Sequence, residues 1–453
     1  MEPFWILETG ARAIPESHNL FLANDFGACG DGVSLCTAAI QAAVDAAAEA
    51  GGGKVTFSPG KYLSGTIRMK SMVNLDIPQG TTLVASENPN DYPEVFTRHA
   101  GIEMLYIAPL ILVDNCRNAA VTGNGVIDGQ GRRWWNLFLY QMLPDYEKKG
   151  LRWCVDYDCR RPKILVIQNS ENVVVQGIRF QRSPHWTIHV LYSSYVTVDN
   201  VEIMNNIDGR GPSTDGIDID SSEFVRVSHC LVDCNDDNFC LKSGRDADGL
   251  RVNRPCRNIL IEHCRALSGR GLVTIGSETA GGISDILVRN CSCEGTDCGI
   301  RFKSTSSRGG YIHDIAFEEI DMESTGIAIE MDLDWFPEYS NCTLADDFRN
   351  ASIPSHWKAL LKPVIPPERG IPVIEDISFR GIKAKNAENC CQMRGTPLIR
   401  PRRLHFQDVS LQGKRGGFII WMQADDVHNF SIASPVKTIF DNAETLEKSV
   451  CHI

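Results

Sequence analysis

The chain has 453 residues, of which 43% are apolar and 23% charged, and a formal net charge of −12. This composition is ordinary for a folded globular protein, and the acidic balance argues against general binding to nucleic acid or to anionic membranes. No apolar run approaches the roughly 18–20 residues that a membrane-spanning helix needs. We therefore expect neither nucleic acid nor membrane as a partner, although a local basic cleft could still bind an anionic substrate.

The first 19 residues precede the repeats described below, and we expect an N-terminal extension there. They lack a basic stretch followed by an apolar stretch, so they do not resemble a signal peptide. The 17 cysteines show no zinc-type spacing. Several of them stand where neighbouring repeats carry Val or Ile, which is typical of small buried side chains. We expect a cytoplasmic location for the chain as written, and a periplasmic or secreted one if a signal segment has been removed.

One clear helix is predicted, over residues 35–50 (LCTAAIQAAVDAAAEA). Alanine favours helix, Ser34 is a candidate N-cap and Gly51 a candidate terminator. Because this helix precedes the first strand repeats, we expect it to cover the N-terminal end of the core. An uncovered end would expose apolar side chains and unpaired strand edges.

Eight short segments share one pattern, with apolar residues at the second, fourth and seventh positions. Such alternation predicts a strand with one buried face. The segments recur every 23 to 34 residues, apart from one gap of 62 that we interpret as two turns with one pattern obscured, and this recurrence predicts a solenoid. They are NVVVQGI (172–178), YVTVDNV (195–201), FVRVSHC (224–230), NILIEHC (258–264), DILVRNC (285–291), DIAFEEI (314–320), DISFRGI (376–382) and RLHFQDV (403–409).

A second set of strands lies in the same turns. Two or three short strands per turn without helices between them predict an all-β fold, a right-handed parallel β-helix, in a single domain over residues 20–453. Pro- and aromatic-rich insertions near 134–161 and 332–373 interrupt the repeats, and we expect them to be loops on one face that either line a site or cap the fold. The second set is GIDIDSS (216–222), NFCLKSG (238–244), GLVTIGS (271–277), GIRFKS (299–304) and GIAIEM (326–331).

Charged residues stand directly before consecutive strands of this second set. Asp215 precedes the first, Asp237 (with Asp236 beside it) the second, and Arg270 the third. Equivalent residues of successive turns lie about 4.8 Å apart. We therefore expect Asp215, Asp237 and Arg270 to form a column, with Asp236 next to it.

Two further cations are predicted on the same wall. Alternation within GIRFKS sends Ile300 and Phe302 inward and Arg301 and Lys303 outward. Carboxylates this close repel each other and raise at least one pKa. A fold does not need this arrangement, which therefore indicates function, and one protonated with one ionised carboxyl group can cleave a glycosidic bond. The plainer alternative, a solvated charge ladder, suits three carboxylates and three cations on one wall poorly.

At this point the sequence resembles a known family. STDGIDIDSS, NDDNFCLKSG, SGRGLVTIGSE and GIRFKS are similar, in order and spacing, to the four signature blocks of the polygalacturonases, glycoside hydrolase family 28. Stretches at 23–32, 51–65, 121–131 and 161–189 resemble its bacterial, mostly exo-acting branch. The resemblance implies inverting hydrolysis of pectic, uronate-containing chains, with no cofactor and no metal. It also implies that Asp236 is the general acid and that Asp215 and Asp237 hold and activate the attacking water.

The resemblance extends to substrate contacts. Arg301 and Lys303 match residues that bind a uronate carboxylate, for which an arginine fork is well suited. His185, in SPHW, is a candidate for lining a sugar subsite, and a packed turn is the alternative. Ser213 replaces a family asparagine, and Arg270 replaces a family histidine. Since arginine cannot shuttle a proton near neutral pH, Arg270 either lowers the pKa of Asp236 or binds another anionic group.

Several hypotheses about function stay open. The leading one is an exo-acting hydrolase of galacturonate-type chains, acting as a monomer, with acid and base carboxyls roughly 6.5–9.5 Å apart. The alternatives are a hydrolase of a different anionic or rhamnogalacturonan-type glycan, a polysaccharide lyase that uses carboxylate-bound calcium, and a catalytically silent carbohydrate-binding β-helix.

Overall fold

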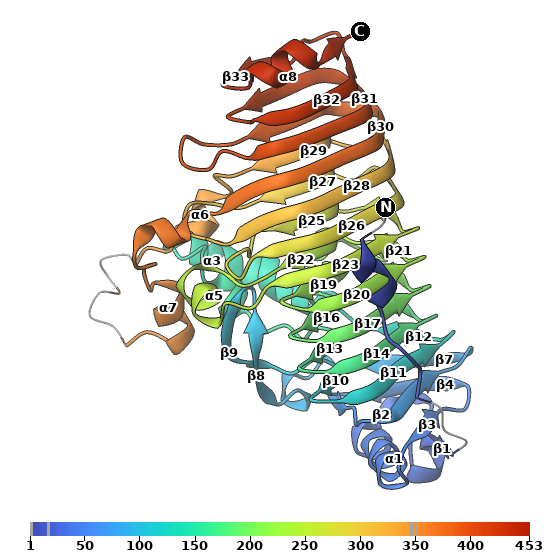
Figure 1. Cartoon of the computed structure of the whole chain (residues 1–453). Coiled ribbons are helices and arrows are strands. Elements are labelled where there is room, and N and C mark those ends of the chain that lie inside the picture. The colour runs from blue at the N-terminus through green and yellow to red at the C-terminus, as the bar shows by residue number, and fades with distance from the viewer. Residues whose placement is uncertain (1–2, 16–18, 345–347, 349–351) are drawn as a thin grey trace.

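The computed structural model describes residues 3–15, 19–344, 348 and 352–453. Its strands stack in parallel, turn upon turn, into one continuous coil around an apolar core (Figure 1). In the first half each turn holds three strands: β13 (Leu165–Gln168), β14 (Glu171–Gln176) and β15 (Arg179–Gln181) each pair with a strand of the next turn. This is the parallel β-helix that the sequence predicts.

The eight repeat segments stack in the expected register. Val173 pairs with Val196, which pairs with Val225, and the column continues turn by turn to Leu404. Its members are at most 1% exposed, and each buried aliphatic side chain contributes about 1.5–3 kcal/mol. The interpretation of the 62-residue gap as two turns is wrong. Ile315 pairs directly with Ile377 in the next turn, so the extra residues form an excursion and not a turn.

The strands lengthen toward the C-terminus because neighbouring strands of a turn merge. The long strands are β26 (Ile283–Glu294), β28 (Tyr311–Glu323), β30 (Val373–Arg394), β31 (Arg402–Ile420) and β32 (Ala424–Ala433), followed by β33 (Ile439–Asp441), α8 (Glu444–Ser449) and β34 (Cys451–His452). Further strands of the coil are β4 (Gly60–Ser64), β5 (Ile67–Arg68), β6 (Val73–Ile77), β7 (Thr81–Ala85), β10 (Ile111–Asp114), β11 (Arg117–Gly123), β12 (Val126–Asp128), β16 (Ile188–Leu191), β17 (Ser194–Asp199), β18 (Glu202–Met204), β19 (Ile217–Asp220), β20 (Glu223–Ser228), β21 (Leu231–Asp233), β22 (Asp237–Lys242), β23 (Cys256–Glu262), β24 (Arg265–Ser268), β25 (Gly271–Gly276), β27 (Cys298–Lys303) and β29 (Ile327–Asp332).

The predicted helix is α1 (Thr37–Glu49), and it covers the N-terminal end of the coil beside β1 (Leu20–Leu22) and β3 (Gly53–Thr56) (Figure 1). Its buried face includes Ile40 and Val44. Gly51 follows it with φ +83°, as a helix terminator does. The predicted cap is wrong: Ser34 belongs to β2 (Asp31–Leu35), where its hydroxyl donates to Asp31, and the N-cap position is Cys36.

The N-terminal residues 3–15 run along the outside of the coil (Figure 1). A short 3-10 helix, η1 (Phe4–Glu8), places Ile6 against Leu260 and Leu287 of two successive turns. Further on, the Gly10 amide donates to the Phe224 carbonyl at 2.9 Å. This part of the chain is therefore attached to the flank of the coil.

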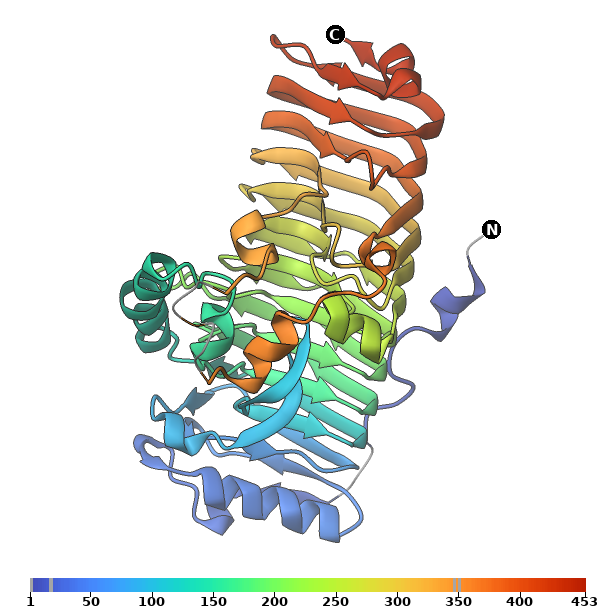
Figure 2. The same ribbon diagram turned by 90° about the vertical axis from the view of Figure 1, so that its left-hand side faces the viewer.

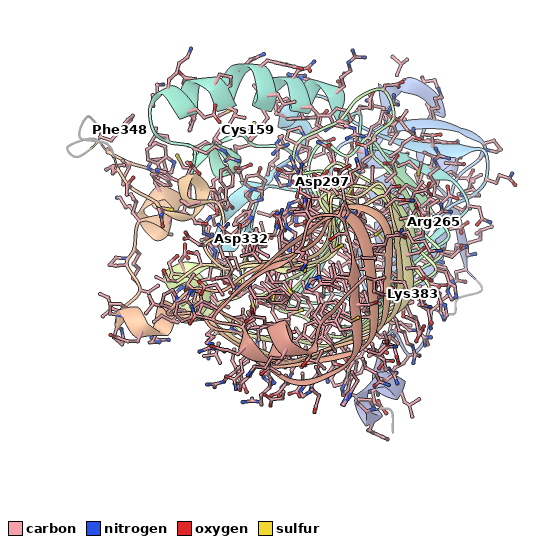
Figure 3. All side chains as sticks on the ribbon, turned by 90° about the horizontal axis from the view of Figure 1, so that it is seen from above. Cys159, Arg265, Asp297, Asp332, Phe348 and Lys383 are labelled. Carbon is pink, nitrogen blue, oxygen red and sulfur yellow. The ribbon has the colours of Figure 1, made fainter. Side chains whose placement is uncertain are left out.

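Three excursions leave the coil on one face (Figure 2). The first is the antiparallel hairpin of β8 (Glu94–His99) and β9 (Ile102–Ile107). In Figure 3, Cys159 and Phe348 lie on the second and third excursions, across the coil from Lys383. The second holds α2 (Arg132–Asn136), the π-helix η4 (Leu137–Met142), α3 (Leu143–Lys148) and α4 (Val155–Asp158), and the third α6 (Pro337–Ser340), α7 (Ser355–Leu360) and η6 (Pro367–Gly370).

Other short helices are η2 (Ala23–Phe26), η3 (Pro89–Asp91) and α5 (Asp246–Val252). Among the helices of the described segments, none is long and apolar enough to cross a bilayer. The cysteines that share one repeat position, Cys230, Cys264 and Cys291, are each 2% exposed in the core. They are the small buried side chains that the repeat pattern predicts.

Candidate active site

Three carboxylates meet on the face from which the excursions leave. They come from the ends of consecutive turns: Asp215 before β19 (Ile217–Asp220), Asp236 before β22, and Asp237 at the start of β22 (Asp237–Lys242). One carboxylate oxygen of each lies within 4.8 Å of the other two. Three carboxylate oxygens at this spacing could also bind a hard cation such as Ca²⁺. The predicted cluster therefore forms, mostly buried, with Asp215 3% and Asp237 1% exposed.

The predicted column is right for the aspartates and wrong for Arg270. Asp215 stacks on Asp237, whose carbonyl accepts from the Gly216 amide at 2.9 Å. The residue paired with Asp237 in the next turn, however, is Gly271, the first residue of β25 (Gly271–Gly276). The pairing of Phe239 with Val273 continues the register that joins Val225 to Ile259. Arg270 therefore lies opposite Asp236, and its amide donates to the Asp236 carbonyl at 2.8 Å.

The Arg270 side chain lies at the rim of the site. It is 58% exposed and pairs with Asp297 of the following turn at 3.0 Å. Its positive charge still lowers the pKa of Asp236. Arg270 thus lies close enough to influence the carboxylates electrostatically without taking a place in their column.

Asp237 is held as an anion by two cations from β27 (Cys298–Lys303). Lys303 Nζ lies 2.6 Å from Asp237 Oδ2, and an Arg301 guanidinium nitrogen lies 3.6 Å from Oδ1. The Thr274 hydroxyl donates to Oδ1 at 2.8 Å. Burial by itself would raise the pKa of Asp237, but Lys303 and Arg301 outweigh it and hold that pKa below its ordinary range.

Asp215 and Asp236 have the opposite electrostatic balance. Burial raises the pKa of Asp215 well above its ordinary value, and the charges of Asp236 and Asp218 raise it further. Burial also raises the pKa of Asp236, followed by the charge of Asp237, while Lys303 and Arg270 partly oppose the rise. The site therefore combines one firmly ionised carboxylate with two that can hold a proton, which is what acid–base chemistry requires.

The expected separation of the carboxyl groups is wrong. Oxygens within 4.8 Å of one another are closer than the roughly 6.5–9.5 Å typical of inverting glycosidases. Stacking on adjacent turns explains the short distance, since neighbouring strands lie about 4.8 Å apart. The ion pairs of Asp237 offset the repulsion that this proximity creates.

Asp215 and Asp236 line a cavity of about 540 Å³, within the range of small-molecule sites, and Asp237 lies next to them. The excursions supply much of its wall. The lining residues are Ala100, Phe138, Leu139, Leu143, Arg152, Asp156, His185, Trp186, Arg210, Pro212, Ser213, Asp215, Asn235, Asp236, Lys242, Arg270, Ser277, Glu278, Arg301, Lys303, Trp335, Phe336 and Tyr339.

The second and third excursions, which both contribute residues to the lining, also contact each other directly. The Trp153 indole donates to the Thr343 carbonyl, and the Trp357 indole donates to Asp158, both at 2.9 Å. The two indoles themselves meet at 5.4 Å between ring centroids. Trp153 is 1% exposed, so this junction is a small core of its own and not a loose contact between loops.

The tip of the hairpin is fixed in the same wall. Tyr157 of α4 donates its hydroxyl hydrogen to the Ala100 carbonyl at 2.7 Å, and the Arg245 amide donates to the Gly101 carbonyl at 3.0 Å. A side chain at Gly101, whose φ is +91°, would clash with Glu278. All three excursions thus meet at one side of the cavity.

His185 and Trp186 form part of the cavity floor. His185 is 2% exposed, and its Nδ1 has no hydrogen-bond partner within the described ranges. Burial, followed by the charge of Arg161, lowers its pKa well below the ordinary value, so its ring is neutral. Trp186 offers little open surface to a sugar, because the ammonium groups of Lys163 and Lys242 lie 4.2 and 4.8 Å from its ring centroid.

Comparison with known proteins places this site in a family. Residues 97–347, which include all three aspartates, match the model of glycosyl hydrolases family 28. The chain belongs to this family. It is a polygalacturonase-like glycoside hydrolase, and residues 21–87 also match the family described as rhamnogalacturonase A/epimerase, pectate lyase-like.

Individual known proteins resemble the chain over most of its length. A probable polygalacturonase of Vitis vinifera is 27% identical over 383 residues, covering 82% of this chain and 70% of that protein. An exo-poly-alpha-D-galacturonosidase of Dickeya chrysanthemi is 27% identical over 354 residues, covering 70% of this chain and 56% of that protein. The crystal structure of a hyperthermoactive exopolygalacturonase from Thermotoga maritima superposes with a TM-score of 0.75 at 25% identity, covering 94% of both chains.

Several cavity residues of this family 28 protein escape prediction from the repeats. Lys242 is the exception that could have been found. Alternation in the strand NFCLKSG directs its side chain outward, and it lies in the same column as Lys303, with Gly276 between them. Glu278 follows a strand end without any pattern. Arg152, Trp335 and Tyr339 lie in the insertions, whose sequence carries no periodicity from which their direction could be read.

Proposed function

We propose that the protein is an exo-acting, inverting hydrolase of galacturonate-type pectic chains. The observation that carries the proposal is the cluster of Asp215, Asp236 and Asp237, beside Arg301 and Lys303. Apart from Asp237, these residues line a cavity that three excursions enclose on one side. The relatives whose names describe action on polygalacturonate support the substrate class.

In the proposed reaction Asp236 is the general acid. Its raised pKa keeps a proton available for the leaving glycosidic oxygen. Water adds its oxygen to the anomeric carbon as the glycosidic bond breaks, and its proton passes to Asp215 or Asp237. Asp237, held ionised by Lys303, positions that water, and Asp215, whose Oδ1 is buried without a hydrogen-bond partner among the described residues, faces the same space.

Arg301 and Lys303 are the proposed receptors for a uronate carboxylate. Both line the cavity and contact Asp237. A bound carboxylate would therefore sit next to the reacting carboxylates. The guanidinium of Arg301 also pairs with Glu330 at 2.5 Å, which fixes the direction of its planar fork.

Exo action follows from the shape of the wall. A long chain can pass through an open groove, but Ala100, Asp156 and Tyr339, from the three excursions, line one side of this cavity. The contact between Trp153 and Trp357 holds the second and third excursions together. A chain end can still enter. We therefore propose release of one terminal sugar per encounter and not cleavage in the middle of the chain.

Product analysis by mass spectrometry tests this proposal. The protein and its Asp236→Asn variant are incubated with polygalacturonan, oligogalacturonides and rhamnogalacturonan fragments. The expected result is a saturated monosaccharide that only the unmodified protein releases. An unsaturated product would indicate a lyase, a product from rhamnogalacturonan alone would change the substrate, and no product from any pectic chain would overturn the proposal.

The stereochemistry needs a separate test, because the carboxylates are closer than in typical inverting enzymes. Proton NMR of the first product formed reports its anomeric configuration. Inversion is expected, since the ion pairs of Asp237 leave it poorly suited to form a covalent bond to the sugar. Net retention would mean that one aspartate is a nucleophile and would refute the assignment of roles.

A further inference from the structure

The side of the cavity beneath the hairpin tip, here called the closed end, is lined by Ala100, Arg152, Asp156, Lys242, Glu278 and Tyr339. These residues connect to one another through a chain of contacts. Lys242 Nζ lies 3.2 Å from Glu278 Oε2, Glu278 packs against Gly101 of the hairpin tip, and Arg152 lies 5.5 Å from the Tyr339 ring. Tyr157 and Arg245, at most 1% exposed, seal the space behind them.

The charges at the closed end are balanced in pairs. Lys242 pairs with Glu278 and lies 3.5 Å from Asp218, and Arg152 pairs with Asp156 at 2.6 Å. The Lys242 and Glu278 side chains are 4% and 5% exposed. The other cations of the lining differ, because the acidic partners of Arg301, Lys303 and Arg270 (Glu330, Asp237 and Asp297) are not among the lining residues, and Arg210 is exposed.

This difference has a chemical consequence. A hydroxyl group donates one hydrogen bond and accepts others, so it fits between an acceptor carboxylate and a donor ammonium group. A uronate carboxylate only accepts, and beside Glu278 it would be repelled. The closed end therefore suits ring hydroxyls of a sugar, whereas the cations whose acidic partners lie outside the cavity lining suit carboxylates.

We infer that Glu278 and Lys242 bind the free 4-hydroxyl of the terminal sugar, so that the enzyme accepts only saturated, unmodified non-reducing ends. The inference rests on the proposed function and deepens it. In a (1→4)-linked chain only the non-reducing terminal sugar has a free 4-hydroxyl. Hydrolysis leaves this hydroxyl in place, but an eliminase breaks the bond between C4 and its oxygen and leaves a 4,5-unsaturated ring without it. The enzyme would thus consume ends made by hydrolases and reject ends made by eliminases.

The test compares three uronate trimers in the unmodified enzyme: one with a saturated end, one with a 4,5-unsaturated end and one with a 4-O-methyl end. We expect kcat/KM to fall at least about 100-fold for each altered end, because a buried polar pair left without its partner discriminates strongly. This comparison needs no variant, so folding does not affect it. Comparable kcat/KM values for the three trimers would overturn the inference.

The variant Glu278→Gln tests whether Glu278 causes the preference for saturated ends. It should lose on the order of 10- to 100-fold in kcat/KM for the saturated end and little for the altered ends, so that the preference collapses. Glu262→Gln is the matched control, since Glu262 is also a buried, ion-paired glutamate, held by Arg226 and Arg289 outside the cavity. A loss that is equal for all three trimers would assign Glu278 a structural role and overturn the inference. Absence of turnover of even the saturated trimer by the unmodified enzyme would instead refute the proposed function.

Discussion

Replacing Lys303 with methionine tests the electrostatic account of the site. Lys303 Nζ and Asp237 Oδ2 are 2.6 Å apart, and the two side chains are 7% and 1% exposed. Removing one partner of such a buried pair leaves an uncompensated charge, at a cost of about 3–5 kcal/mol. Unfolding of 453 residues carries an entropy of roughly 1 kcal/mol per kelvin, so Tm should fall by about 3–5 °C.

The dependence of this loss on pH follows from the pKa of Asp237. Because that pKa is lowered in the folded protein, the pair stabilises the fold above the ordinary carboxyl pKa of about 4, and the stabilisation disappears as the pH falls and Asp237 takes up a proton. The difference in Tm between the unmodified protein and Lys303→Met should therefore be full at pH 7 and shrink below about pH 4. Calorimetry across this range measures it.

The double variant Lys303→Met, Asp237→Asn is the control. It removes both charges, so most of the lost stability should return while activity stays absent. A Tm for Lys303→Met within 1 °C of the unmodified protein at pH 7 would refute the reasoning, as would a double variant whose losses simply add.

Three further predictions concern catalysis. Asp215→Asn and Asp236→Asn should each lower kcat by about 10²–10⁴-fold at unchanged Tm or better, measured by reducing-sugar release; activity within tenfold would contradict their roles. Arg270→Gln removes a cation that lowers the pKa of Asp236, so the alkaline limb of the kcat/KM profile should move to higher pH. The shift should be below one unit, because Arg270 is 58% exposed; a shift to lower pH would be inconsistent with an acid at Asp236. Trp153→Ala should cost about 3–5 kcal/mol at the junction of the excursions and raise the share of oligomeric products in chromatography; unchanged monomer release would show that this junction does not enforce exo action.

The coil could be predicted because its physics is local and repeated. Every turn must bury the same face against its neighbours, so the residues from Val173 to Leu404 repeat one pattern that survives in the sequence. The same alternation directs Arg301 and Lys303 outward to Asp237. Where the pattern holds, both fold and site can be read from it.

The other features of the site depend on strand register and tertiary contacts, which the repeat pattern of the sequence does not specify. The expected column assumed that Asn238 pairs with Gly271, whereas the buried Phe239 pairs with Val273, and this pairing places Arg270 opposite Asp236. The excursion after β29 (Ile327–Asp332) looked like a missing turn because a count of residues does not separate a turn from a loop. Glu278 and Tyr339 reach the cavity only through tertiary packing.

The most direct test of the central claim uses a pentagalacturonide tagged at its reducing end. Mass spectrometry of early time points shows which bond breaks first. The account predicts an untagged saturated monosaccharide together with a tagged tetramer, and no other fragments until the pentamer is nearly consumed. Tagged fragments of several lengths from the outset would contradict exo action, and untagged fragments one water lighter than the hydrolysis product would contradict hydrolysis itself.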